Sequence, residues 1–140
     1  MPRILLMDDD MPLALEVAGA LRKEGHEVVV TNTATDARDE LWHWDFDLLI
    51  TDIVVRKSGR PVADGGFGLI SWVRQQQIAT PELTHLPIIA ISGAASHPAL
   101  QFILPTADRI GADVVLEKPF DMVQIIAEID RLCSVPKAQG

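Results

Sequence analysis

Five short apolar runs, separated by longer segments of mixed polarity, constrain the fold of this chain more than any other feature. Most of the runs are continuous rather than alternating, which is typical of strands buried on both faces of a parallel sheet. Right-handed crossovers between such strands put helices on both faces. The pattern therefore predicts an α/β fold with a doubly wound, five-stranded parallel sheet. The runs comprise residues 4–7, 28–30, 48–50, 88–91 and 114–116.

The first and last intervening segments predict amphipathic helices. The last helix, over residues 122–133, has apolar residues at i, i+3, i+4 and i+7. Gly25 suits the end of the first helix, and Asp121 with Gln124 resembles a capping box at the start of the last. The apolar face of the first helix is formed by Leu13, Val17 and Leu21.

Three further helices bring the expected number to five. Residues 34–44 and 67–77 have weaker helical patterns, and a fourth helix would precede the last strand. That helix contains Pro98 and Pro105, which would shorten or kink it. Residues 1–134 are expected to form one domain, followed by a frayed tail over residues 135–140.

Size and charge exclude several classes of protein. A chain of 140 residues can bury one sizeable core. Its formal charge of −8 argues against binding to nucleic-acid phosphates, which requires clustered Lys and Arg. The nearest approach to a basic patch, Arg56, Lys57 and Arg60, is expected to be a solvated loop.

The cellular setting follows from the amino terminus and the single cysteine. The apolar run at residues 4–7 is too short for a signal peptide or a membrane span, so a soluble, cytoplasmic protein is expected. Cys133 lies on the apolar side of a helical pattern and is interpreted as a small buried hydrophobe.

Polar side chains follow four of the five predicted strands. Parallel strands end at one edge of the sheet, where ligands of doubly wound folds bind. Carboxylates gathered there repel one another, and a hard divalent cation such as Mg²⁺ or Mn²⁺ would relieve that repulsion. The residues at these strand ends are Asp8, Asp9 and Asp10; Thr51 and Asp52; Ser92 and Gly93; and Glu117, Lys118 and Pro119.

These side chains suit phosphoryl transfer to an aspartate. A cation beside the acids would neutralise phosphate charge, while Lys118 would add a positive charge and Ser92 a hydroxyl donor. A carboxylate nucleophile that forms an aspartyl phosphate is a known form of covalent catalysis.

Four segments resemble the receiver domain of two-component response regulators. They occur in the family's order and cover nearly the whole chain. The resemblance implies a flavodoxin-like fold with strand order 2-1-3-4-5. The matching segments are residues 4–10, 47–52, 86–93 and 111–120.

The resemblance also implies the roles of the acids. Asp52 would receive the phosphoryl group and, with Asp9, bind Mg²⁺ or Mn²⁺ directly. Asp8 would act mainly through metal-bound water, and the backbone carbonyl of Val54 would be a further ligand. On the phosphate, Ser92 and Lys118 would each bind an oxygen, and the peptide bond between Lys118 and Pro119 would be cis.

Two departures from the family affect signal output. Val115 occupies the position of the family's aromatic switch residue, so a ring cannot swing there. The loop over residues 54–65 is longer than the family's usual loop. Output is therefore expected to use backbone or helix shifts.

The family also implies partners. The donor would be a phosphohistidine on a histidine kinase or a histidine phosphotransfer protein, and the acyl phosphate would hydrolyse slowly. We expect a stand-alone receiver without an output domain, which would signal through a separate effector protein. We expect a signalling protein rather than an enzyme, with no direct contact to nucleic acid or membrane.

Three alternatives remain open at this point. One is a receiver that has lost phosphorylation and serves only as an interaction module. Another is a flavodoxin-like cofactor binder, although Asp8 to Asp10 would repel a flavin phosphate. The third is a haloacid-dehalogenase-type phosphatase, which expects a second acid where this chain has Val54.

Other polar and aromatic residues have simpler interpretations. Asp10 is expected to cap a helix or remain solvated rather than bind metal. Trp42, Trp44 and Phe46 are expected to pack between the second helix and the sheet.

Overall fold

Five parallel strands form one sheet in the order β2-β1-β3-β6-β7. The structure is a computed structural model that describes residues 2–53, 56–57, 60–61, 66–75, 85–92, 111–117 and 120–134. Because β6 and β7 are the fourth and fifth strands of this sheet in the chain, the expected order 2-1-3-4-5 is confirmed. The strands are β1 (Arg3–Met7), β2 (Glu27–Thr31), β3 (Leu48–Asp52), β6 (Ile88–Ser92) and β7 (Val114–Glu117).

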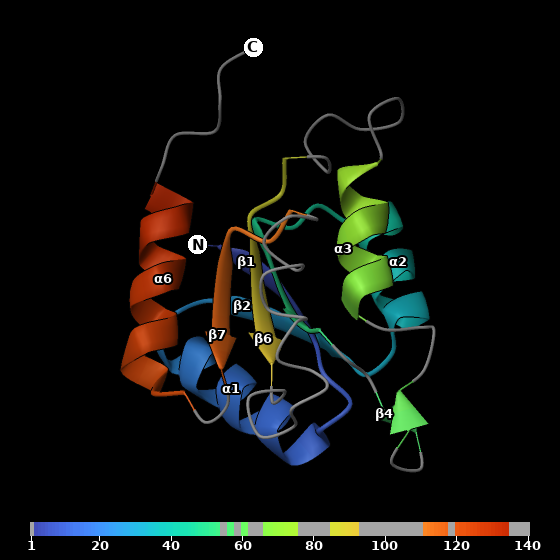
Figure 1. The fold of residues 1–140 in the computed structure, drawn as a ribbon. Coiled ribbons are helices and arrows are strands. Elements are labelled where there is room, and N and C mark those ends of the chain that lie inside the picture. Colours follow the sequence, from blue (N-terminus) through green and yellow to red (C-terminus); the bar gives the residue numbers. More distant parts are fainter. Residues whose placement is uncertain are drawn as a thin grey trace.

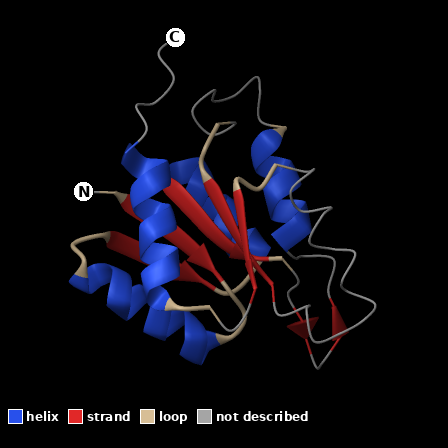
Figure 2. Ribbon diagram, turned by 60° about the vertical axis from the view of Figure 1, so that its left-hand side comes forward, coloured by secondary structure: helices blue, strands red, loops and turns tan. Residues whose placement is uncertain are grey.

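Helices cover both faces of the sheet, as the doubly wound pattern predicts (Figures 1 and 2). One face carries α1 (Met11–Lys23) and α6 (Met122–Ser134), and the other carries α2 (Ala34–His43) and α3 (Gly66–Arg74). The expected fourth helix, with its two prolines, lies outside the described residues. None of the helices in the described part of the chain is long and apolar enough to cross a membrane.

The pleat of each strand divides its side chains between two cores. In β1, Ile4 and Leu6 face α1 and α6, while Leu5 and Met7 face α2 and α3. All four are at most 1% exposed. Burial on both faces explains why the strands are continuous apolar runs in the sequence. Cys133 is partly buried against the core beside α1 and α6, in line with its interpretation as a hydrophobe.

The helix ends use the residues that the sequence indicated. Asp10 caps α1 by accepting a hydrogen bond from the Leu13 amide at 3.1 Å. Gly25 follows α1 with a φ of 93°, which favours glycine. At the start of α6, Asp121 accepts a bond from the Val123 amide at 3.0 Å. The predicted cap therefore acts on the second helical residue.

The aromatic residues at the end of α2 correct one prediction. Phe46 is buried, but Trp42 and Trp44 are 60% and 55% exposed. The sheet-facing side of α2 is formed by Ala34, Ala37 and Leu41. Since Trp42 is about 100° further round the helix than Leu41, it falls outside this side. Trp44 caps the helix in an extended conformation.

The basic segment after β3 also differs from the expected loop. Its backbone forms two short antiparallel strands, β4 (Arg56–Lys57) and β5 (Arg60–Pro61). Arg56 pairs with Pro61 and Lys57 with Arg60. Composition alone did not indicate this antiparallel pairing.

An arginine from α3 ties together the amino ends of β6 and β7. Arg74 Nη1 donates to the Leu86 carbonyl at 2.7 Å, and Nη2 donates to the Gly111 carbonyl at 2.6 Å and to Asp113 Oδ2 at 3.0 Å. Asp113 Oδ2 also accepts from the Ile88 amide at 2.8 Å. Burial lowers the pKa of Arg74 below its ordinary value, and Asp113 opposes that shift. We call these five residues the arginine clamp.

Candidate metal centre

Three carboxylates meet at the carboxyl edge of the sheet. Strands β1 and β3 are paired so that Met7 lies opposite Thr51, and Asp8 and Asp52 follow at the same level. Ligand oxygens of Asp8, Asp9 and Asp52 all lie within 4.8 Å of one another. Asp8 and Asp52 are buried, and Asp9 is partly buried. We call these three residues the acid cluster.

Backbone pairing holds the acid cluster in place. The Asp8 amide donates to the Thr31 carbonyl at 3.1 Å, and Asp8 Oδ1 accepts from the Asp10 amide at 2.9 Å. On the neighbouring strand, Asp52 is the last residue of β3, and the next amide, of Ile53, donates to β6 at 2.8 Å. The carboxylates therefore project from backbone that the sheet has already ordered.

The donor set fits a hard divalent cation. Three carboxylate oxygens supply negative charge and oxygen ligands, which Mg²⁺ and Mn²⁺ prefer. Burial of Asp8 and Asp52 reduces solvent screening, which strengthens both their mutual repulsion and their attraction to a cation. The acid cluster could hold a divalent cation and bring it beside the Asp52 carboxylate.

Only some of the remaining predicted site residues lie in the described part of the chain. Ser92 is the last residue of β6 and pairs with Glu117 of β7, but its side chain is outside the described part. Val54 and Lys118 lie outside the described residues, as does the bond from Lys118 to Pro119. Val115 is partly buried and packs against the core on the side of α2 and α3.

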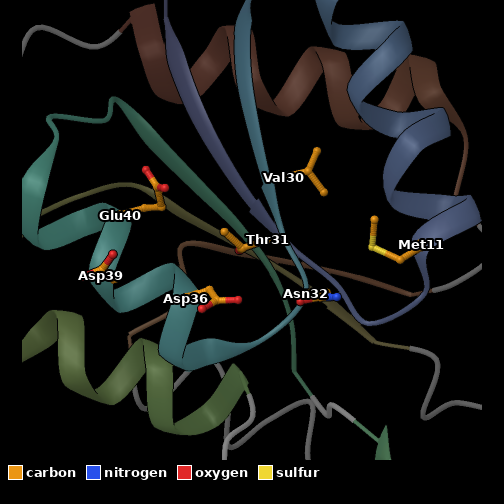
Figure 3. Close-up of a pocket in the computed structure, with 7 residues that line it drawn as sticks. All are labelled: Met11, Val30, Thr31, Asn32, Asp36, Asp39 and Glu40. Atoms are coloured by element: carbon orange, nitrogen blue, oxygen red, sulfur yellow. The ribbon is translucent and has the colours of Figure 1, made fainter.

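A second acidic feature, which the sequence reasoning missed, lies beside α2. Figure 3 shows a hollow between α1 and α2, lined by acids from α2 and by Met11 at the start of α1. Its volume is about 320 Å³. The available signal was the spacing of Asp36, Asp39 and Glu40 at i, i+3 and i+4. We call it the α2 hollow; its lining comprises Met11, Val30, Thr31, Asn32, Asp36, Asp39 and Glu40.

Comparison with known proteins decides the family. The family model described as the response regulator receiver domain matches residues 4–130. This chain belongs to that family. Receiver domains are signalling proteins of two-component systems, which separates the chain from the flavodoxin-like cofactor binders and from the haloacid-dehalogenase-type phosphatases.

Curated relatives include receivers of different total length. The response regulator receiver protein CpdR of Brucella abortus is 30% identical over 132 residues, covering 94% of this chain and 97% of CpdR. The DNA-binding transcriptional regulator NtrC of Bradyrhizobium is also 30% identical, over 138 residues. That match covers 96% of this chain but only 25% of NtrC, so the chain spans about a quarter of that relative's length.

Solved receiver structures have the same fold. The receiver domain of the Francisella response regulator 1452 superposes with a TM-score of 0.81 at 20% identity, covering 98% of this chain and 100% of that chain. The receiver domain of NtrX from Brucella abortus gives a TM-score of 0.75 at 29% identity, covering 95% and 99%. The first comparison supports the fold alone, because its identity is low.

Proposed function

We propose that this receiver domain accepts a phosphoryl group on Asp52 from a phosphohistidine, in a reaction that requires Mg²⁺ or Mn²⁺. The observation that carries the proposal is the acid cluster, with carboxylate oxygens within 4.8 Å at the ligand-binding edge of a receiver fold. The donor would be a histidine kinase or a histidine phosphotransfer protein. Asp52 is the candidate nucleophile because the family's phosphoacceptor motif falls on residues 47–52.

The roles within the acid cluster follow from position and charge. A bound divalent cation would supply positive charge to the phosphoryl oxygens. One Asp52 oxygen attacks phosphorus, an O–P bond forms, and the P–N bond of the donor breaks so that imidazole leaves with the electron pair. Asp9 and Asp52 would bind the cation directly, and Asp8 mainly through water. The ordered end of β3 would orient the nucleophile.

The phosphorylated state would use residues near the other strand ends. We propose that Ser92 and Lys118 each bind a phosphate oxygen and that the Val54 carbonyl completes the protein ligands. Val115 offers no ring to swing, so the signal would leave through backbone or helix shifts. Residues 1–134 would act as one domain that binds a separate effector protein in the cytoplasm. Its only catalysis would be slow hydrolysis of its own acyl phosphate.

Intact mass spectrometry tests the proposal. The protein is incubated with a small phosphodonor, with Mg²⁺ or with a chelator, beside Asp52→Asn and the matched control Asp10→Asn. We expect one added phosphoryl group on native protein and on Asp10→Asn, only with Mg²⁺, and none on Asp52→Asn. An unmodified native protein would favour the alternative of a phosphorylation-incompetent interaction module. An adduct that persists in Asp52→Asn would contradict Asp52 as acceptor.

A further inference from the structure

Two large aromatic side chains are exposed at the carboxyl end of α2, Trp42 on the helix and Trp44 directly after it. Trp42 and Trp44 are 60% and 55% exposed, whereas Trp72, the third tryptophan, packs against the core. Exposed tryptophans leave apolar area in water, and tryptophan is among the residues that contribute most to protein interfaces. Such a pair at one helix end marks a surface that a partner can cover.

The exposed surface of α2 beside these tryptophans is acidic. Residues 34–45 contain four acids, one arginine (Arg38) and one histidine, His43, whose Nδ1 lies 3.3 Å from Asp39 Oδ1. Asp36 and Asp39 are exposed and line the α2 hollow, together with Glu40 (Figure 3). Asp39 is also three residues before Trp42, so the two are neighbours on the helix surface. Asp39 therefore lies between the hollow and Trp42 on the surface of α2.

A guanidinium already contacts the aromatic end of this face. Arg3 Cζ lies 5.3 Å from the centre of the Trp44 ring and 5.2 Å from that of Phe46. These distances are within the range of cation–π attraction. Trp44 is still 55% exposed with Arg3 in place. The aromatic end thus suits cationic groups and has surface left for another.

We propose that the outer face of α2 is a docking site for a partner segment that carries arginine or lysine. One cationic side chain packs on the exposed indoles of Trp42 and Trp44, and a second enters the α2 hollow beside Asp36 and Asp39. Charge complementarity supplies orientation and the indoles supply buried area. The proposal does not depend on phosphorylation of Asp52.

The charge of this face disfavours other occupants. A two-fold contact between copies of this chain would place the same acidic patch on both sides of the interface. The acids would likewise repel an anionic lipid surface or a nucleic-acid backbone. A cationic peptide pairs with these acids instead.

Indole N–H signals in NMR spectra provide the test, since the chain has only three tryptophans. Unphosphorylated protein is titrated with a dodecapeptide of alternating arginine and alanine, and separately with its glutamate counterpart. We expect saturable shifts of the Trp42 and Trp44 signals with the arginine peptide, none with the glutamate peptide, and an unmoved Trp72 signal. Tryptophan-to-phenylalanine variants assign the three signals.

Variants separate a specific site from general attraction to an acidic protein. Trp42→Ala and the double variant Asp36→Asn with Asp39→Asn should each weaken binding by about two- to fivefold. The matched control, Glu16→Gln with Asp130→Asn, removes the same charge from exposed positions on α1 and α6 and should leave affinity unchanged.

Four results would overturn the proposal. The first is that the arginine peptide shifts neither the Trp42 nor the Trp44 indole signal, and the second is that the matched control weakens peptide binding as much as the site variants do. The third is that the indole signals shift with protein concentration when no peptide is present, and the fourth is that the protein binds anionic vesicles in preference to the peptide. The third result would indicate contact between copies of the chain, and the fourth a lipid surface.

Discussion

The two edges of the central sheet differ in which charged groups they bring together. At the amino ends of β6 and β7, the arginine clamp places one guanidinium among two carbonyl oxygens and the Asp113 carboxylate, all 2.6 to 3.0 Å away. At the carboxyl ends of β1 and β3, the acid cluster gathers three like charges within 4.8 Å. Opposite charges meet at the first edge, and like charges meet at the second.

This difference separates residues that serve the fold from residues that serve chemistry. A clamp of complementary groups lowers the free energy of the folded chain and needs no ligand. A cluster of like charges is unfavourable until a cation or another ligand balances it, which is why such clusters mark functional sites. Substitutions in the clamp should therefore change stability, and substitutions in the acid cluster should change ligand binding.

The largest effect on stability is expected at Arg74. Arg74→Met keeps the aliphatic stem but removes the guanidinium donor from the Leu86 and Gly111 carbonyls, and it leaves the Asp113 carboxylate with the Ile88 amide. The free energy of unfolding should fall by about 2–4 kcal/mol, with partial exposure of Asp113 reducing the effect. Urea unfolding measures it. Arg74→Lys should lose less, and a loss under about 0.5 kcal/mol for methionine would show that the clamp is energetically unimportant.

The next largest effect is expected at Gly111. Its φ of 121° is strained for other residues, and a Cβ would lie 2.6 Å from Arg74 Cγ. Gly111→Ala should reduce stability by about 1–3 kcal/mol. A double-mutant cycle of Gly111→Ala with Arg74→Ala separates the backbone strain from the side-chain contact. Removal of Arg74 Cγ relieves the contact and leaves the backbone strain. Full additivity in that cycle would contradict a role for the contact.

Magnesium should stabilise the protein through the acid cluster alone. At a concentration ten to thirty times its dissociation constant, Mg²⁺ should raise the free energy of unfolding by about 1–2 kcal/mol. Asp9→Asn should remove most of this gain, whereas Arg74→Met should keep it despite lower overall stability. Urea unfolding with Mg²⁺ and with chelator gives both values. If stabilisation by Mg²⁺ were lost in Arg74→Met but kept in Asp9→Asn, Mg²⁺ would bind at the arginine clamp rather than at the acid cluster.

The smallest effect distinguishes Asp10 from the two acids before it. Asp10→Ala removes the cap of α1 and should reduce stability by about 1 kcal/mol. The gain from Mg²⁺ should be unchanged, because Asp10 serves the helix rather than the cluster. Thermal unfolding with and without Mg²⁺ checks both expectations. If Mg²⁺ no longer stabilised Asp10→Ala, Asp10 would belong among the metal ligands.

The sequence predicted the parts of this fold that depend on local pattern. Continuous apolar runs located the five strands of the central sheet because both faces of that sheet are buried. Asp8 and Asp52 could be expected to meet because parallel strands end at one edge. The strand order itself came from the family resemblance, since periodicity does not record which strands pair.

Features that depend on tertiary contacts were missed. Arg74 and Gly111 have their roles because the Arg74 side chain reaches the Gly111 carbonyl, 37 residues further along the chain. Trp42 and Trp44 were expected inside because aromatic residues usually pack, but the end of α2 turns them outward. Composition likewise did not indicate the pairing of Arg56 with Pro61.

The most direct test of the acid cluster is the position of the phosphoryl group. After phosphorylation, borohydride reduces an aspartyl phosphate to homoserine, and peptide sequencing by mass spectrometry then locates the changed residue. We predict homoserine at position 52, formed only when Mg²⁺ was present. Homoserine at position 8, 9 or 10, or at position 52 to the same extent with chelator, would contradict the account.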